Sequence, residues 1–257
     1  MKNSPAAYLM AILCVIACSA RAQNAGELKF LEKFKEKLPA GYTVKFELYP
    51  NSDRVQTVTP LNPQGQPDGE AIVKAQYGWE ILRSIPYKNG VQEGVEKEFE
   101  FGEVEGKRVL YLRKETPWLA GKVHGVKKLF HPNGRVMSES SYVNGITDGP
   151  SRSYDLSGRL DREAHFKNGK REGAMTEYWT LTGKPKSIIP YKLGKVDGLV
   201  QEFFDSGKLK KEVTLKDDEF HGIEKRFDED GVLLKTVYWL RDKEVSKQEF
   251  ETGGKAP

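Results

Sequence analysis

The sequence predicts an all-β protein in which tandem β-hairpins form an elongated, twisted antiparallel meander behind a short N-terminal helix. A unit of about 24 residues recurs along most of the chain, and such a fixed period indicates a repeat architecture. Glycine provides 25 of the 257 residues, and Asn-Gly, Ser-Gly and Asp-Gly steps recur within the units, as tight turns require. Two strands and two turns in one unit leave no room for a crossover helix, so neighbouring strands are expected to be antiparallel.

Residues 1–22 are predicted to be a signal peptide. Lys2 precedes an apolar stretch from Ala6 to Ala17, and the small residues Ala20 and Ala22 precede the expected cleavage site. This stretch is too short to anchor the chain across a bilayer, and an apolar run at the extreme N-terminus favours export over the alternative of a buried helix. We therefore expect an exported protein, located in the periplasm, in the cell envelope or outside the cell.

The only two cysteines of the chain, Cys14 and Cys18, lie in this segment. The run from Val15 to Cys18 resembles a bacterial lipobox, so Cys18 is a candidate lipidation site, and a lipid anchor there is the one membrane contact expected. Cleavage after Ala22, which we favour slightly, gives instead a secreted chain without cysteine. Such a chain has no disulfide, thiol nucleophile or thiolate metal site.

Residues 23–41 are predicted to form a capping helix. Between Glu27 and Leu38 the apolar residues recur at helical spacing on one face, and the pattern ends at the Pro39-Ala40-Gly41 run. We expect this helix to cover the open end of the sheet, which is otherwise an exposed edge. Residues 42–86 carry a degenerate form of the repeat, and residues 87–257 carry the clear repeats.

The clear repeats share a skeleton of one aromatic residue, two further residues, a glycine, three residues and a second glycine. We call the first of these positions the leading aromatic; it is held by Tyr87, Trp118, Tyr142, Phe166, Tyr191 and Trp239, and by the aliphatic Leu215 in one unit. The paired, turn-forming glycines are Gly90/Gly94, Gly121/Gly125, Gly145/Gly149, Gly169/Gly173 and Gly194/Gly198. A second aromatic follows at Phe99, Phe130, Tyr154, Tyr178, Phe203 and Phe227.

Two kinds of turn are expected to join the strands of each unit. Lys-Asn-Gly and its variants mark one turn, and steps such as Asn133-Gly134 and Asp230-Gly231 mark the opposite one. The step from Tyr87 to Trp118 is longer than the others because about seven extra residues lie between Phe101 and Pro117. This insertion predicts a longer hairpin or loop.

These motifs resemble the MORN-variant repeat, and in particular the bacterial YwqK-type antitoxin proteins. The resemblance rests on the Tyr/Phe-x-Asn-Gly-x-x-x-Gly steps at Tyr87, Tyr142 and Phe166 and on the Tyr/Phe-x-x-x-Gly-x-Leu steps at Tyr154 and Phe203. It implies a β-repeat fold and a role as a scaffold, a lipid-associated protein or a toxin neutraliser. An export signal is a departure from a cytoplasmic antitoxin.

The sequence favours a non-enzymatic protein without a cofactor. It contains no Gly-x-Ser-x-Gly, HExxH or phosphate-loop motif. His124 and His221 occupy equivalent positions, but equivalent atoms of successive hairpins are about 9.5 Å apart, too far to share a metal ion. The acidic runs at residues 217–219 and 228–230 lack the order of a calcium loop. A hydrolase with two carboxylates in a cleft is the remaining enzymatic alternative.

Charge argues against nucleic acid as the partner. Lysine and arginine number 41 against 37 acidic residues, a net +4, and the two signs are interspersed. The leading aromatics offer a candidate binding face instead, composed of Trp118, Tyr142, Phe166, Tyr191 and Trp239. The alternative is that these rings form the packing layer of the sheet, and we expect at least one of the two aromatic series to be buried.

The leading hypothesis is a protein-interaction scaffold of the bacterial cell envelope, similar to antitoxin or immunity proteins, that binds an unidentified protein partner. Its basis is a repeat that carries no convergent catalytic set. Binding of an envelope glycan or of lipid through the aromatic series is the alternative.

Overall fold

The computed structural model describes residues 25–253, which fall into two compact units, residues 25–122 and 123–253. The predicted signal peptide, with Cys14 and the lipidation candidate Cys18, lies outside the described residues. Neither helix between residues 25 and 253 is long and apolar enough to cross a membrane. Each unit is described separately below.

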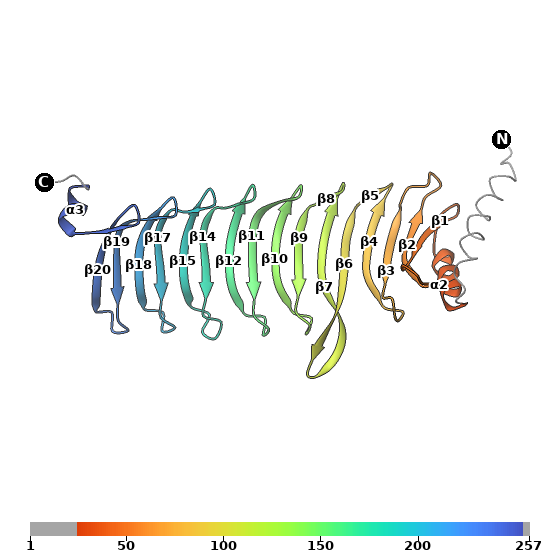
Figure 1. Cartoon of the computed structure of the whole chain (residues 1–257), viewed down its shortest axis with the longest axis horizontal. Coiled ribbons are helices and arrows are strands. Elements are labelled where there is room, and N and C mark those ends of the chain that lie inside the picture. The colour runs from red at the N-terminus through yellow and green to blue at the C-terminus, as the bar shows by residue number, and fades with distance from the viewer. Residues whose placement is uncertain (1–24, 254–257) are drawn as a thin grey trace. The chain divides into compact units, whose positions relative to one another are not determined.

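The first unit contains one helix and a run of antiparallel strands (Figure 1). Its elements are α2 (Ala25–Glu36), β1 (Thr43–Leu48), β2 (Val55–Leu61), β3 (Gly69–Lys74), β4 (Ile81–Lys88), β5 (Val91–Gln92), β6 (Gly94–Val104) and β7 (Lys107–Leu119), and β8 (Lys122–Val123) lies at the unit boundary. The insertion predicted between Phe101 and Pro117 is a hairpin: β6 and β7 pair from Gly94↔Trp118 to Val104↔Lys107 and extend beyond the other strands of the unit (Figure 1).

Helix α2 packs against a face of the first strands. Phe30, Leu31 and Phe34 contact a core formed by Val55, Val58 and Ile72 of β2 and β3. The sequence predicted a capping helix over the open end of the sheet, and the contacts described for α2 are with this face. β2 and β3 present apolar side chains there, and burying them removes apolar area from water.

A buried ion pair holds the helix to this face. Lys74 of β3 is fully buried, and its Nζ lies 2.6 Å from Oε2 of Glu27 in the first turn of α2. The Lys74 ammonium also lies over the rings of Phe30 and Trp79, 4.5 and 4.3 Å from their centroids. Burial removes the hydration of the ammonium group. The carboxylate and the two aromatic ring faces offset this loss.

The second unit is a continuous antiparallel meander. Its strands are β9 (Gly125–Phe130), β10 (Val136–Val143), β11 (Ile146–Tyr154), β12 (Leu160–Lys167), β13 (Lys170–Arg171), β14 (Gly173–Tyr178), β15 (Pro185–Lys192), β16 (Lys195–Val196), β17 (Gly198–Phe203), β18 (Leu209–Lys216), β19 (Glu219–Phe227), β20 (Leu233–Leu240) and β21 (Lys243–Val245). The helix α3 (Lys247–Glu251) follows, with Ser246 and Glu249 forming a capping box.

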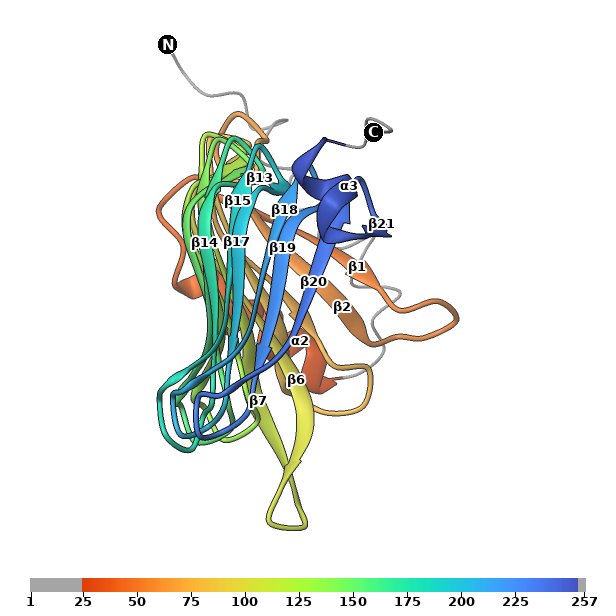
Figure 2. The same ribbon diagram turned by 90° about the vertical axis from the view of Figure 1, so that its left-hand side faces the viewer.

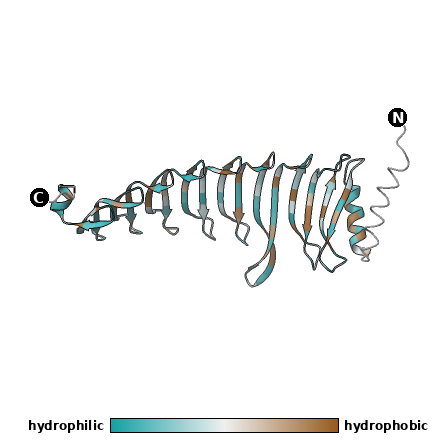
Figure 3. Cartoon of the chain, turned by 45° about the horizontal axis from the view of Figure 1, so that its top comes forward, coloured by the Kyte–Doolittle hydropathy of each residue, from teal (hydrophilic) through white to brown (hydrophobic). Residues whose placement is uncertain are grey.

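The prediction of an all-β antiparallel meander with a short N-terminal helix is confirmed. The strands of both units pair with antiparallel neighbours, and α2 and α3 are the only helices between residues 25 and 253. Figure 3 shows apolar and polar residues interspersed along the strands, whose successive side chains point to opposite faces of the sheet.

The Asn-Gly turns are two-residue hairpin loops in which both residues have positive φ. At Asn144 and Gly145 the φ angles are 51° and 88°, which indicates a type I′ turn. Asparagine at the first position and glycine at the second meet this requirement at low conformational cost. The degenerate last repeats use Asp217-Asp218 and Arg241-Asp242 in the same conformation.

At the opposite ends of the strands, each turn of the second unit is bonded to the next. The residue after the turn glycine is a cation that donates a hydrogen bond to a carbonyl of the following turn. The Arg135 guanidinium donates to the carbonyl oxygen of Ser157. Lys184 Nζ lies 2.6 Å from the carbonyl oxygen of Ser206, and Lys208 Nζ lies 2.7 Å from that of Glu229. In the last such turn Val232 takes the place of the cation, and among the described residues no further turn of this kind follows on this side of the sheet.

Candidate interaction surface

The leading aromatics are half-buried and lie opposite the second glycines. The register pairs Trp118 with Gly94, Tyr142 with Gly125, Phe166 with Gly149, Tyr191 with Gly173 and Trp239 with Gly222. A ring opposite a glycine covers backbone that no side chain protects. Of the five residues predicted as a binding face, Tyr142, Phe166, Tyr191 and Trp239 therefore share one face of the second unit and take part in its packing. Trp118 has the corresponding place in the first unit.

All ten glycines of the predicted set have positive φ, but they divide into two groups. Gly90, Gly121, Gly145, Gly169 and Gly194 lie in the two-residue turns, whereas Gly94, Gly125, Gly149, Gly173 and Gly198 lie in strands. The turn-forming role predicted for all ten thus belongs to the first five. At Gly198, a Cβ atom would lie 2.9 Å from Cγ of Pro190, so close approach of the neighbouring strand also requires glycine there.

Buried glutamates bind the two leading tryptophans. Trp118 Nε1 donates to Oε2 of Glu96 at 2.8 Å, and Trp239 Nε1 donates to Oε2 of Glu224 at 3.1 Å. Both glutamates are 2% exposed and each also pairs with an arginine, Arg83 or Arg226. These hydrogen bonds fix the orientation of both indole rings on the sheet.

The opposite face of the second unit carries a row of exposed and half-buried apolar residues, which we call the apolar stripe. It consists of Val126, Pro150, Ala174, Pro190, Leu199 and Ile223. Val126 and Leu199 are 45% and 43% exposed, and five of the six residues directly follow a second glycine. Because adjacent residues of a strand point to opposite faces, this position lies on the other face from the leading aromatics.

Next to the apolar stripe on the same face runs a charged ladder. Arg152 of β11 lies between Glu139 and Glu163, with N–O distances of 3.5 and 3.7 Å, and Lys225 pairs with Glu212 at 2.9 Å. The register places the first three on β10, β11 and β12 and the last two on β18 and β19. The equivalent positions of β14, β15 and β17 hold Thr176, Ile188 and Gln201, so the charged ladder consists of two segments beside the apolar stripe.

Two tyrosines of the second aromatic series donate hydrogen bonds to glutamates of the charged ladder. Tyr154 donates to Glu139 at 2.9 Å, and Tyr178 donates to Glu163 at 2.6 Å. Partial burial raises the pKa of both phenols above the ordinary value, and the neighbouring carboxylates raise it further.

The raised pKa values predict how stability depends on alkaline pH. The folded state keeps phenolic protons that the unfolded state loses, so the free energy of unfolding falls as pH rises above about 10. Urea unfolding at several alkaline pH values measures this fall. A Tyr154→Phe/Tyr178→Phe variant should show a shallower fall, and an identical pH dependence of both proteins would contradict the assignment.

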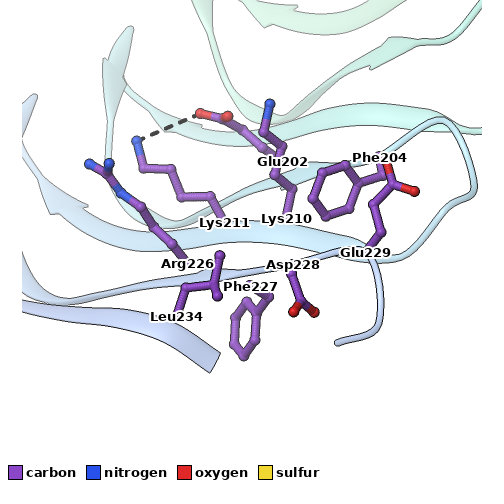
Figure 4. Close-up of a pocket in the computed structure, with 9 residues that line it drawn as sticks. All are labelled: Glu202, Phe204, Lys210, Lys211, Arg226, Phe227, Asp228, Glu229 and Leu234. Atoms are coloured by element: carbon purple, nitrogen blue, oxygen red, sulfur yellow. Dashed lines mark ion pairs between the residues drawn. The ribbon is translucent and has the colours of Figure 1, made fainter. Parts of the chain in front are cut away.

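A shallow hollow of about 630 Å³ lies near the end of the second unit (Figure 4). Its lining comes from β17 to β20 and the turns between them: Glu202, Phe204, Lys210, Lys211, Arg226, Phe227, Asp228, Glu229 and Leu234. Lys211 pairs with Glu202 at 3.7 Å, whereas Phe204, Phe227 and Leu234 make part of the hollow apolar. It can receive an amphipathic side chain.

The polar residues considered above as catalytic or metal-binding candidates mainly form hydrogen bonds between successive repeats. Glu172, at the repeat position of His124 and His221, accepts a hydrogen bond from the backbone N–H of Leu193 at 2.8 Å. Asp218 accepts one from Val196 at 2.7 Å. Among residues 25–253, no group of three His, Cys, Asp or Glu side chains lies close enough to hold a metal ion.

Sequence reasoning missed the apolar stripe and the Glu27–Lys74 pair. The stripe had a signal in the sequence, namely an apolar or small residue directly after most second glycines. The ion pair had none, because its partners are 47 residues apart and neither stands out from the many other charged residues.

A family model described as MORN repeat variant matches four segments of the second unit, residues 123–144, 147–168, 196–217 and 220–240. The MORN-variant part of the resemblance is therefore confirmed for these four repeats. The similarity to YwqK-type antitoxin proteins stays a prediction.

No curated protein matches the chain. Among solved structures, two of TarM, one of them an S. aureus mutant in complex with Fondaparinux, alpha-GlcNAc-glycerol and UDP, are 14% and 15% identical over 63% and 58% of this chain, with TM-scores of 0.22 and 0.21. The chain spans about a quarter of their length, 27% and 26%. A porin-like protein from Bacteroides uniformis is 10% identical over 81% of this chain and 94% of its own, with a TM-score of 0.20. These scores are too low to indicate a shared fold.

Proposed function

We propose that this chain is a non-enzymatic scaffold of the bacterial cell envelope that binds a protein partner through the face carrying the apolar stripe and the charged ladder. The observation that carries the proposal is the exposure of an apolar row on a regular sheet whose turns and opposite face are engaged in bonds between repeats. An exposed apolar row beside charged residues is typical of a protein-binding surface. MORN repeats typically bind proteins or lipids, which agrees with this role.

Two finer points belong to the proposal. The apolar N-terminal segment of the sequence supports an envelope location, because a chain with such a segment is exported. The similarity to YwqK-type proteins supports a toxin as the partner, which the chain would neutralise by covering a surface of it. Intact-mass analysis of the exported chain distinguishes cleavage after Ala22 from lipidation at Cys18.

Capture of a partner from envelope extracts of the source bacterium tests the binding face. Immobilised mature chain is expected to retain a reproducible partner, and a Leu199→Lys/Ile223→Lys variant should retain about tenfold less, because binding would desolvate two unpaired charges. Leu181→Lys is the matched control: Leu181 is 86% exposed in a turn outside the stripe, so this variant should bind like the wild type. Equal capture by all three proteins, or no capture, contradicts the proposal.

A second candidate, binding to an anionic membrane surface, is favoured by one turn edge of the second unit. A hollow of about 420 Å³ beside Leu193, which is 68% exposed, is lined by four lysines and two aspartates: Lys170, Lys192, Lys195, Lys216, Asp197 and Asp217. Lys195 pairs with Asp217 at 3.8 Å, and the lysines outnumber the acids by two. Cations flanking an apolar tip suit a phosphate headgroup and the acyl boundary. Salt-sensitive co-sedimentation with phosphatidylglycerol liposomes, absent with phosphatidylcholine, would favour this candidate, and a glycan array tests envelope sugars as the other ligand class.

A further inference from the structure

Part of the last long strand of the second unit has no neighbour on its outer side. β20 pairs with β19 from Leu233 to Trp239, but with β21 only at Tyr238, Trp239 and Leu240. The chain then enters α3, whose Phe250 packs on Tyr238 with ring centroids 5.3 Å apart. Figure 2 shows α3 and β21 beside one end of β20 only. Residues 233–237 therefore form an open edge among the described strands.

The repeat shows which residue of β20 would face a further strand at this edge. Arg162, four residues before its leading aromatic, lies opposite Glu177 of the next strand, and the N–O distance is 2.9 Å. One repeat later, Ser187 lies opposite Glu202. The equivalent residue of β20 is Lys235, and the position opposite it is empty in the described sheet. At the same position the other repeats of this unit place Ser138 opposite Ser153 and Lys211 opposite Arg226, so the repeat fixes the position and not the residue type.

Charge at the edge favours an acidic residue opposite Lys235. The register places Glu202, Lys211, Arg226 and Lys235 in one row across β17 to β20. Lys211 pairs with Glu202 and Arg226 pairs with Glu224, but Lys235 is exposed and forms no ion pair with the described residues. A carboxylate on an added strand, placed opposite Lys235, would supply the ion-pair partner that Lys235 lacks.

The backbone of Thr236 is also directed outward. Leu240 and Lys243 flank a two-residue turn, so their backbone groups bond each other. Because backbone groups of a strand point alternately to its two sides, those of Tyr238 and Thr236 point to the same side as those of Leu240. At Thr236 no strand receives them.

We propose that this open edge of β20 binds an extended segment of another protein by strand addition, with a glutamate or aspartate of that segment opposite Lys235. The inference rests on the proposed function, because it names a partner class for the same scaffold. The hollow lined by Phe204, Phe227 and Leu234 would receive a neighbouring apolar side chain of the segment. A second copy of this chain suits the edge less well, because Glu47 of its own open strand β1 already pairs with Lys45 at 3.0 Å.

A peptide copied from the chain itself is a suitable probe. A fluorescein-labelled peptide with the sequence of residues 197–204 carries Glu202 in the required position, and its partner peptide carries Glu202→Lys. By fluorescence anisotropy, the mature chain is expected to bind the first peptide about tenfold more tightly than the second. The Lys235→Glu chain should reverse this preference. Absence of binding, or a preference that Lys235→Glu leaves unchanged, overturns the proposal.

A backbone variant separates strand addition from simple charge attraction. Thr236→Pro removes an N–H that faces the open edge and spares the pairing with β19, so the variant should fold but lose peptide binding. Thr236→Val keeps the N–H and should bind like the wild type, and thermal unfolding verifies that both variants are folded. Peptide binding by Thr236→Pro at wild-type strength overturns the proposal, as does a dimer of the free chain that Thr236→Pro abolishes.

The same variants keep this proposal distinct from the general one. If Thr236→Pro captures the envelope partner as the wild type does and the peptide fails to bind, the edge proposal is wrong and the scaffold function stands. If no partner is captured by any protein, the scaffold function is wrong whatever the peptide does.

Discussion

Replacing Glu27 by alanine is expected to destabilise the first unit by about 3–5 kcal/mol, the largest effect of any single substitution considered for this chain. Lys74 is fully buried, and its Nζ lies 2.6 Å from the Glu27 carboxylate. Without that carboxylate, the ammonium keeps only the faces of Phe30 and Trp79 as partners, and an uncompensated buried charge is costly. Urea unfolding followed by tryptophan fluorescence measures the loss.

Two further variants decide whether burial of the charge is the cause. A Glu27→Leu/Lys74→Met double variant removes both charges and should lie within about 2 kcal/mol of the wild type. Glu47→Ala removes an exposed ion pair of the same unit, with Lys45, and should cost less than about 1 kcal/mol. If Glu27→Ala and Glu47→Ala cost the same, the ion pair does not hold the helix as described.

The second large effect is expected from Gly198→Ala, which should destabilise the second unit by about 3 kcal/mol. Gly198 has φ of 129°, a conformation that residues with a side chain rarely adopt, and its Cβ would lie 2.9 Å from Cγ of Pro190. Backbone strain and a steric clash with a rigid proline ring therefore add together. Urea unfolding of the variant measures the combined loss in the free energy of unfolding.

Gly173 is the matched control, because it has the same place in its repeat but no heavy atom within 4 Å of its ideal Cβ. Its φ of 83° still makes alanine unfavourable, so Gly173→Ala should cost about 1 kcal/mol. Adding Pro190→Ala to Gly198→Ala should recover part of the loss. Equal costs at both glycines would show that close approach of the strands plays no part.

The fold could be predicted from the sequence because the repeat encodes it locally. Asn-Gly turns, aromatic residues at a fixed spacing and the absence of helical patterns define hairpins without knowledge of distant contacts. The seven extra residues near Phe101 identified the long hairpin β6–β7 in the same way. What the repeat did not reveal is where α2 packs, because that depends on the apolar face that β2 and β3 form together.

The candidate surface was harder to predict than the fold. The aromatic residues Trp118 and Trp239 attract attention in the sequence, but their partners Glu96 and Glu224 become visible only when the strands are in register. The stripe residues Leu199 and Ile223 are ordinary aliphatic residues whose exposure depends on which face they occupy. The identity of an aliphatic residue does not show which face of the sheet its side chain occupies. That face is known only once the bulges and turns that set the register are known.

Site-specific photo-crosslinking in the envelope tests the binding face most directly. A benzophenone amino acid at position 199 or 223 should crosslink one and the same partner, because both side chains lie on the apolar stripe. The same group at position 181, which is more exposed but lies in a turn, should give no such product. Crosslinking from position 181 with none from 199 and 223 would contradict the account.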